Sequence, residues 1–222
     1  MKFSLTFDQT VEYIETIYEN APTGYQFHVD DLERAKSPIN NGACSNSSHK
    51  LATISQSVCS LSLTNCPLGF ALGLWMRINP TANVAMDTKI VLYEHGNLEV
   101  SAIFDEENKQ FVKSVVSYKA TGELCPFDIH LPLKAWFHLA IHVTSPSQIH
   151  VALNGLTVED FNKKCSEEEF DGDVESGEIR FGGSGLEVCV DEIHVSVDRY
   201  SVNGLVLHLY YPYTHGEFLK PF

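Results

Sequence analysis

The sequence lacks long apolar runs. No stretch of its 222 residues approaches the ~18 apolar residues that a membrane-spanning helix needs, so direct insertion into a membrane is not expected. The first residues, Met1 to Asp8, contain too short an apolar run for a secretory signal. If the chain is secreted, we therefore expect it to be a processed form or a fragment of a larger protein, such as a receptor ectodomain.

Basic residues are also few. Lys and Arg together number 15 against 29 Asp and Glu, which gives a formal net charge of −14. A field of this sign repels phosphate groups, so nucleic acids and anionic membrane surfaces are not expected as partners. Cations and basic proteins are compatible with this charge.

Motifs of the common catalytic sites are absent. There is no G-x-S-x-G nucleophile elbow, and Gly182-Gly183-Ser184-Gly185 precedes no helical pattern, so it predicts a turn rather than a phosphate-binding loop. The one adjacent carboxylate pair on a predicted strand is Asp191-Glu192. Because neighbouring strand positions face opposite ways, the two cannot flank one glycosidic bond. We interpret them as an edge pair that anchors a turn, and we predict no catalytic residue and no enzyme activity.

The cysteines lack any CxxC pair. An even number of widely spaced cysteines fits disulfides better than a zinc site, and disulfides indicate an oxidising location, extracellular or at the cell surface. Asn46-Ser47-Ser48 is an acceptor sequence for glycosylation at Asn46, which indicates the same location. The six residues concerned are Cys44, Cys59, Cys66, Cys125, Cys165 and Cys189.

Residues 8–19 form the one segment with helical periodicity. Apolar residues recur there at spacings of three and four, namely at Phe7, Val11, Ile14, Ile17 and Tyr18. Ala21-Pro22-Thr23-Gly24 ends the pattern. The sequence therefore predicts a short N-terminal helical segment, residues 1–24, that lies on its own domain. An amphipathic tether to a partner is the alternative.

From residue 25 onwards the apolar residues have a period of two. Turn signals recur about every ten residues, and such short, regularly spaced strands are typical of a sandwich or jelly roll. Residues 30–67 predict loops and short strands pinned by disulfides. We predict an all-β, two-sheet antiparallel sandwich over residues 25–222. Its clearest strands are Phe70–Ile78, Ile90–Tyr93, Leu98–Phe104, Phe111–Tyr118, Trp136–Val143, Gln148–Asn154, Glu178–Phe181, Leu186–Val190 and Ile193–Val197.

Three segments in order resemble laminin-G-like and concanavalin-A-like domains, a superfamily related to the pentraxins. They are Phe70–Arg77 (FALGLWMR), Trp136–Ala140 followed by Ile149–Gly155, and Ile179–Gly183 followed by Cys189–Ile193. The resemblance implies a jelly roll that binds glycans, proteins or sulfated polymers, often beside a calcium ion. It also implies a disulfide between Cys189 and Cys165, because these domains pair a late cysteine with one upstream. The other four cysteines allow three pairings, between which the sequence does not choose.

An acidic loop offers ligands for calcium. Glu167 to Glu175 is rich in carboxylates, and Asp171, Asp173 and Glu175 lie in its second half. Hard oxygen ligands on a loop suit Ca²⁺. The alternative is a solvated loop that binds no ion.

The predicted hairpin around Ser145-Pro146-Ser147 brings two histidines together. Its register places His142 opposite His150 on the outward face, with His138 further along the same face. Facing Cβ atoms lie about 5 Å apart, close enough for two imidazoles to share a zinc or copper ion, or to act as a pH sensor. The alternative is that they are half-exposed strand residues without a special role.

These observations favour an extracellular recognition module that binds a protein partner in adhesion or receptor recognition. The alternative is a glycan-binding lectin domain, with or without calcium. Apart from calcium, no cofactor is predicted. A degenerate glycosidase and a rigid spacer within a larger ectodomain are further alternatives.

Overall fold

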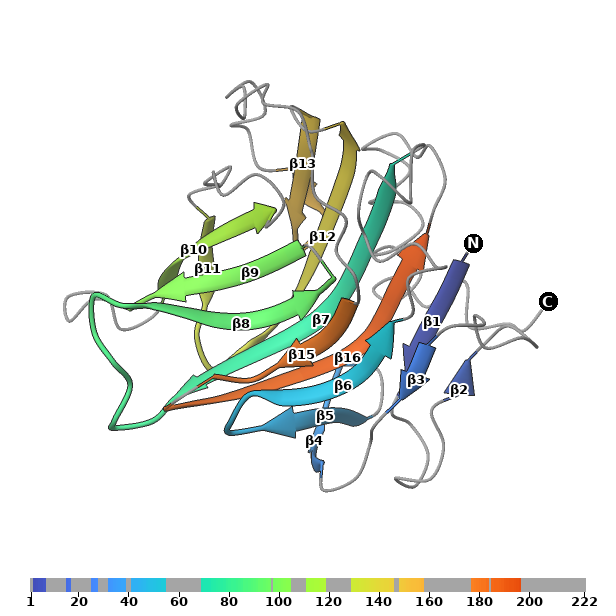
Figure 1. Ribbon diagram of the computed structural model, residues 1–222. Coiled ribbons are helices and arrows are strands. Elements are labelled where there is room, and N and C mark those ends of the chain that lie inside the picture. The colour runs from blue at the N-terminus through green and yellow to red at the C-terminus, as the bar shows by residue number, and fades with distance from the viewer. Residues whose placement is uncertain are drawn as a thin grey trace.

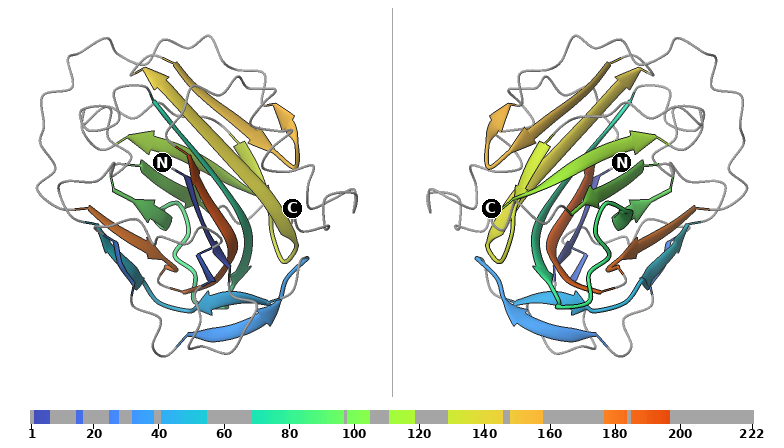
Figure 2. Two further views of the ribbon diagram at one scale, coloured as in Figure 1. Left: turned by 90° about the vertical axis from the view of Figure 1, so that its right-hand side faces the viewer. Right: turned by 90° about the vertical axis from the view of Figure 1, so that its left-hand side faces the viewer.

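The computed structural model describes residues 2–6, 15–16, 25–27, 32–38, 41–54, 69–96, 98–104, 111–118, 129–145, 148–157, 177–183 and 185–196. All secondary-structure elements among these residues are strands, which form two antiparallel sheets that face each other across one core (Figure 1 and Figure 2). In this part of the chain, no helix has the length and hydropathy needed to cross a bilayer. The predicted all-β sandwich is confirmed.

The larger sheet contains nine of the described strands. They are β1 (Lys2–Thr6), β2 (Glu15–Thr16), β4 (Glu33–Lys36), β5 (Asn41–Ser45), β7 (Phe70–Pro80), β12 (Trp136–Ser145), β13 (Gln148–Leu153), β14 (Leu156–Thr157) and β16 (Leu186–Ser196). The main order is β14-β13-β12-β7-β16-β1-β2, and β5 pairs with both β16 and β4. Strand β7 is therefore hydrogen-bonded to two strands, β12 and β16, that follow it at long distance in the sequence.

The smaller sheet contains seven of the described strands. They are β3 (Tyr25–Phe27), β6 (His49–Ile54), β8 (Lys89–His95), β9 (Leu98–Ile103), β10 (Phe111–Tyr118), β11 (Ile129–Pro132) and β15 (Gly177–Phe181). Their order is β11-β10-β9-β8-β15-β6-β3. Strand β15 thus lies between β6 and β8 (Figure 1), although the sequence separates it from both.

The core lies between the sheets and follows the predicted alternation. The alternate residues Phe70, Leu72, Leu74, Met76 and Ile78 of β7 are all fully buried. The neighbouring strand β12 of the same sheet adds a second row, Phe137, Leu139, Ile141 and Val143. Burial of a large apolar side chain contributes about 1.5–3 kcal/mol. These two rows therefore supply a large share of the stabilisation that joins the sheets.

The predicted register of the hairpin β12–β13 is confirmed. His142 pairs with His150 and Leu139 with Leu153. The next turn uses Asn154 and Gly155, whose φ angles are +49° and +76°, the conformation that a tight hairpin with Asn-Gly requires. The Oδ1 atom of Asn154 also accepts a hydrogen bond of 2.9 Å from the backbone N–H of His138. The turn therefore holds β12 as well as β14 in place.

The predicted helix over residues 8–19 is wrong at the two positions that the structure describes. Glu15 and Thr16 form β2, which pairs with β1, and β1 in turn pairs with the end of β16. The remaining residues of the predicted helix lie outside the described part of the chain. A free edge of the larger sheet offers unpaired backbone groups, and pairing with that edge outweighs local helical periodicity here.

The predicted pairing of Cys189 with Cys165 is also wrong, because Cys189 bonds to Cys44. The two residues face each other directly in the pairing of β16 with β5, with a Cα–Cα distance of 4.0 Å. Cys44 was among the four cysteines left unassigned by the sequence. Cys59, Cys66, Cys125 and Cys165 lie outside the described residues, so their pairings stay predictions.

The bond between Cys44 and Cys189 should stabilise the fold strongly, because it closes a long loop. The two cysteines are 145 residues apart in the sequence, and a cross-link over such a distance restricts the unfolded chain by about 4–5 kcal/mol in the chain-entropy account. We expect the double substitution Cys44→Ala and Cys189→Ala to lower the free energy of unfolding by about 2–4 kcal/mol in urea denaturation.

Peptide mapping without reduction tests the pairing itself. A cross-linked peptide pair that contains Cys44 and Cys189 is the expected result. Recovery of Cys189 bonded to Cys165 would contradict the structure.

Candidate functional site

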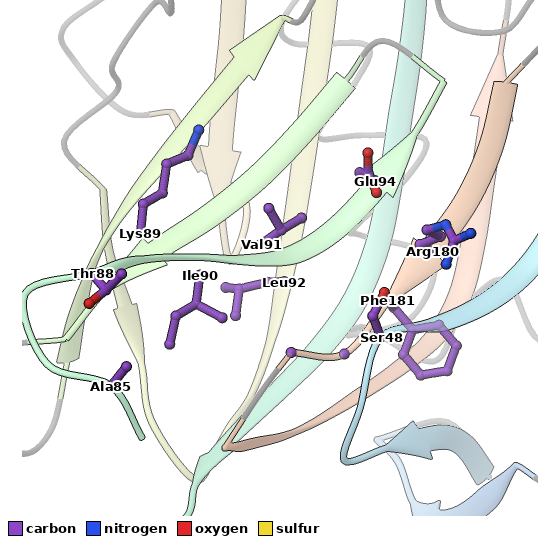
Figure 3. A pocket seen from close by; sticks show the side chains of 12 residues that line it. Ser48, Ala85, Thr88, Lys89, Ile90, Val91, Leu92, Glu94, Arg180 and Phe181 are labelled. Atoms are coloured by element: carbon purple, nitrogen blue, oxygen red, sulfur yellow. The ribbon is translucent and has the colours of Figure 1, made fainter. Parts of the chain in front are cut away.

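An open pocket of about 460 Å³ lies where β8 runs beside β15. Figure 3 shows β8 crossing the site, with Arg180 of β15 and Ser48 of the β5–β6 connection at one end and Thr88 at the other. Three segments that are far apart in the sequence therefore build one surface. The residues that line it are Ser48, Ala85, Thr88, Lys89, Ile90, Val91, Leu92, Glu94, Arg180, Phe181, Gly182 and Gly183.

Charged side chains surround this pocket. The Nε atom of Arg180 lies 2.6 Å from Glu178, whose other carboxylate oxygen lies 2.8 Å from Lys50. The hydrogen bonds from Lys50 and Arg180 lower the pKa of Glu178. Among the described residues, the Nη groups of Arg180 have no hydrogen-bond partner. They can therefore donate to an acceptor in the pocket.

Lys89 is a second cation in the lining of the pocket, and it forms an ion pair with Glu99. The ammonium group of Lys89 lies 2.6 Å from the Glu99 carboxylate, on the neighbouring strand β9. Glu94, half-buried on β8 directly opposite Arg180 of β15, adds a carboxylate to the lining. The site thus combines donors and acceptors at an open surface, as a polar ligand with several hydroxyl or carboxylate groups requires.

Two glycines bring the backbone close enough to shape the pocket. A Cβ atom at Gly182 would lie 2.2 Å from the carbonyl oxygen of Ser47, and one at Gly183 would lie 2.7 Å from the Ile90 side chain. Gly182 also has a φ of +90°. The predicted turn at Gly182–Gly185 is confirmed, and its glycines let β15, β8 and the β5–β6 connection meet.

The histidine pair predicted on β12 and β13 is brought together by the structure. The ring centroids of His142 and His150 are 5.9 Å apart, with ring planes tilted by 30°. The expectation of half-exposed side chains is wrong for His142, which is 1% exposed, and holds for His150. Burial, and then the charge of His150, lowers the pKa of His142 to about 4. Burial also lowers the pKa of His150.

His138, on the same strand, is buried beside Trp75 rather than half-exposed. The rings of these two residues meet edge to face with centroids 5.4 Å apart. Burial, with a smaller contribution from the charge of His194, lowers the pKa of His138 to about 3. The outer face of the larger sheet is therefore covered at this point. The alternation of apolar and polar residues in the sequence gave no sign of this.

Asp191 and Glu192 do not form an edge pair at a turn. Both are buried in the middle of β16, where a bulge between Asp191 and His194 interrupts the pairing with β7. The Ser37 hydroxyl donates to Asp191, and the Nε2 atom of His194 lies 3.3 Å from the Glu192 carboxylate. The interpretation was wrong because a bulge cannot be read from strand periodicity. Since both carboxylates are buried, neither lines the open pocket.

One further group of potential metal ligands is found among the described residues. Cys44, Glu187 and Cys189 lie within 4.8 Å of one another. Both sulfur atoms belong to the disulfide, so neither is a thiolate, which is the form that binds metals. Glu187 instead interacts with Arg77 at 3.2 Å.

The structure describes some of the other predicted site residues and not others. Asp171, Asp173 and Glu175, the candidate calcium ligands, lie outside the described residues. Asn46 lies exposed in the connection between β5 and β6, and its glycosylation stays a prediction. The pocket residues were not predicted, because Arg180, Lys89 and Ser48 come together only through the order of β8, β15 and β6. No local motif signals that order.

His95 is a buried histidine of the smaller sheet. It is fully buried on β8, opposite Ile179, and shares a hydrogen bond of 3.1 Å with the Tyr93 hydroxyl through its Nδ1 atom. Burial lowers the pKa of His95 to about 3. The imidazole is therefore neutral in the folded protein at physiological pH.

Acid should destabilise the fold through these buried imidazoles. The pKa values of His95 and His138 are about 3 in the folded chain against 6.5 for an exposed histidine, so the unfolded chain binds more protons between these values. The free energy of unfolding should therefore fall as the pH drops from about 6.5 towards 3, and these groups add no slope above 6.5. Each additional proton that the unfolded chain binds lowers the free energy of unfolding by about 1.4 kcal/mol for every pH unit of acidification.

Urea denaturation as a function of pH measures this slope. His95→Gln keeps a polar partner for Tyr93 but takes up no proton. The slope of its free energy of unfolding against pH should therefore correspond to about one proton fewer than in the wild type. His130→Gln, an exposed change on β11, is the matched control and should behave as the wild type. An unchanged slope in His95→Gln would show that His95 is not kept neutral by burial.

No protein-family model and no curated protein matches the sequence. The fold does resemble solved structures. The binding domain of botulinum neurotoxin DC in complex with SialylT has a TM-score of 0.58 and 11% identity, with 95% of this chain and 51% of that chain covered. The same domain in complex with rat synaptotagmin II gives a TM-score of 0.58 and 12% identity, with coverage of 93% and 50%.

Trypanosoma rangeli sialidase in complex with sialic acid is similar to the same degree. Its TM-score is 0.58 at 14% identity, and 93% of this chain and 32% of that chain are covered. This chain therefore spans about a third to a half of the length of these proteins. At such low identity the likeness shows the fold alone, a β-sandwich that occurs within toxin binding domains and a sialidase.

Proposed function

We propose that this chain is an extracellular recognition domain that binds a glycan in the pocket between β8 and β15 and catalyses no reaction. The observation that carries the proposal is the pocket itself, in which Lys89, Glu94 and Arg180 surround an open hollow of about 460 Å³. Glycans present many hydroxyl groups and need donors and acceptors in fixed positions. A single strand, β8, supplies most of these positions and keeps their spacing rigid.

The cations of the pocket favour a glycan that carries a carboxylate. A guanidinium group binds a carboxylate through paired hydrogen bonds, and the Nη groups of Arg180 are in position to donate. The sialic acid and SialylT complexes of proteins with a similar fold support this choice of ligand class. Because the whole chain has a charge of −14, such a ligand depends on the local cations rather than on the overall field.

The three segments that resemble laminin-G-like domains fall on strands that are linked in the structure. This arrangement supports a laminin-G-like fold for the chain. They correspond to β7, to the hairpin β12–β13, and to β15 with β16. Strands β12, β7 and β16 are consecutive neighbours in the larger sheet. The disulfide between Cys44 and Cys189, together with the exposed Asn46, supports a place outside the cell.

A protein partner in adhesion or receptor recognition is the second candidate. Leu156 is 75% exposed on the short edge strand β14, and an edge strand can pair with an extended segment of a partner protein. The synaptotagmin complex of a domain with a similar fold supports this candidate. The candidate protein-binding edge at β14 belongs to the larger sheet, whereas the glycan pocket lies on the smaller one.

Substitution of Arg180 tests the glycan proposal. We expect sialyllactose to bind the wild type more tightly than lactose in isothermal titration calorimetry. Arg180→Ala should weaken sialyllactose binding about tenfold or more, because a hydrogen bond to a charged group contributes about 1.5–3 kcal/mol. Arg180→Lys should keep part of the affinity, since it retains the charge without the paired donors.

Lys36→Ala removes an exposed cation from β4 of the other sheet and serves as the control. It should leave sialyllactose binding unchanged.

Titration with added Ca²⁺ and with EDTA tests whether the acidic loop at Asp171, Asp173 and Glu175 assists glycan binding. Analysis of the same samples for released sialic acid tests for catalysis. Equal binding by wild type and Arg180→Ala would rule out this pocket.

Leu156→Ser tests the protein-binding candidate separately. If β14 is the docking edge, this variant should lose most of its binding to a cell-surface protein captured by the wild type, because an exposed leucine buried at an interface contributes about 1.5–3 kcal/mol. Arg180→Ala should then bind the same protein normally. The reverse pattern, in surface plasmon resonance, would place the partner at the pocket.

A further inference from the structure

We propose that His142 and His150 form a binding site for a borderline divalent metal ion, Zn²⁺ or Cu²⁺, on the outer face of the larger sheet. The two residues are direct cross-strand neighbours in the confirmed register of β12 and β13. The site lies on the other sheet from the glycan pocket and does not depend on the proposed function. Imidazole nitrogen is the ligand that both ions favour among neutral side chains.

The distance between the rings fits a shared ion. Two nitrogens that each bind Zn²⁺ at about 2.0–2.1 Å in a tetrahedral arrangement lie about 3.4 Å apart. Ring centroids 5.9 Å apart, on side chains fixed by paired strands, bring the facing edges of the two imidazoles close to this separation.

Both ring nitrogens of His142 are available to bind a metal. Its side chain is 1% exposed, yet neither Nδ1 nor Nε2 makes a hydrogen bond. A buried polar group without a partner costs free energy, about 1–3 kcal/mol, which a coordinated ion would offset.

Small neighbours leave room for the ion. On β7, the residue paired with His142 is Ala71, and one step along the same face Ala140 pairs with Ala152. These three alanines form a buried cluster of their own. None of these positions places a large side chain beside the histidine pair, and water would complete the coordination of the ion. His150 is half-buried and provides access from solvent.

Metal titration of the full chain tests this site. After dialysis against EDTA and removal of the chelator, ZnCl₂ and CuCl₂ are titrated into wild type and variants by calorimetry at neutral pH. We expect wild type to bind one equivalent, with Cu²⁺ bound more tightly than Zn²⁺ as the general order of metal affinities requires. His150→Gln should weaken binding about tenfold or more, because loss of even an outer hydrogen-bond partner of a metal ligand costs 10–100-fold.

His130→Gln, which removes an exposed histidine from the smaller sheet, is the matched control and should bind as the wild type does. His142→Gln should abolish the site, but the change is buried, so the half-buried His150 decides the test. As a direct readout, Zn²⁺ should protect His150 from modification by diethyl pyrocarbonate in peptide mass spectrometry. Either no binding by the wild type, or equal binding by wild type and His150→Gln, would overturn the proposal.

Discussion

Burial of strand β7 on both faces is the constraint on which the rest of the structure depends. Phe70, Leu72 and Leu74 point into the core, and the residues between them, such as Ala71 and Trp75, are buried on the opposite face. From Phe70 to Met76 this strand has no solvent-facing side, so its neighbours must match it there in register and in size. Strands β12 and β16 do so over nearly its whole length.

That constraint sets where the chemical groups of the larger sheet lie. Pairing with Ala71 places a small side chain beside His142, while pairing with Trp75 buries His138 on one side and Asp191 on the other. The bulge in β16 then places Glu192 within reach of His194, and the Cys44–Cys189 disulfide ties β5 to the same strand. His138, Asp191 and Glu192 are thus held inside the fold.

The smaller sheet has the opposite character. Its strands β8 and β15 expose Lys89 and partly expose Arg180 and Glu94 at an open pocket. The cations there are each held by one carboxylate, Glu99 or Glu178, so the pocket is ordered without being closed. This cluster of charges at an open pocket is the physical basis for our proposal that the smaller sheet carries recognition.

Sequence reasoning predicted the parts of the fold that depend on local periodicity. The strands β7, β12 and β13, with the facing of His142 and His150, follow from alternation and turn residues alone. The bulge at Asp191, the partner of Cys189 and the burial of His138 depend on contacts between distant segments. The pocket depends on the insertion of β15 between β6 and β8. The strand at Glu15–Thr16 shows the same limit, since sheet pairing overrides helical spacing.

Mapping of ligand-induced chemical shifts tests the central claim most directly. In ¹⁵N-labelled protein titrated with sialyllactose, the backbone amides of β8 and β15 and of Ser48 should shift together and saturate at one affinity. Shifts confined to β12, β13 and β14, or no saturable shift at all, would contradict the assignment of recognition to the smaller sheet.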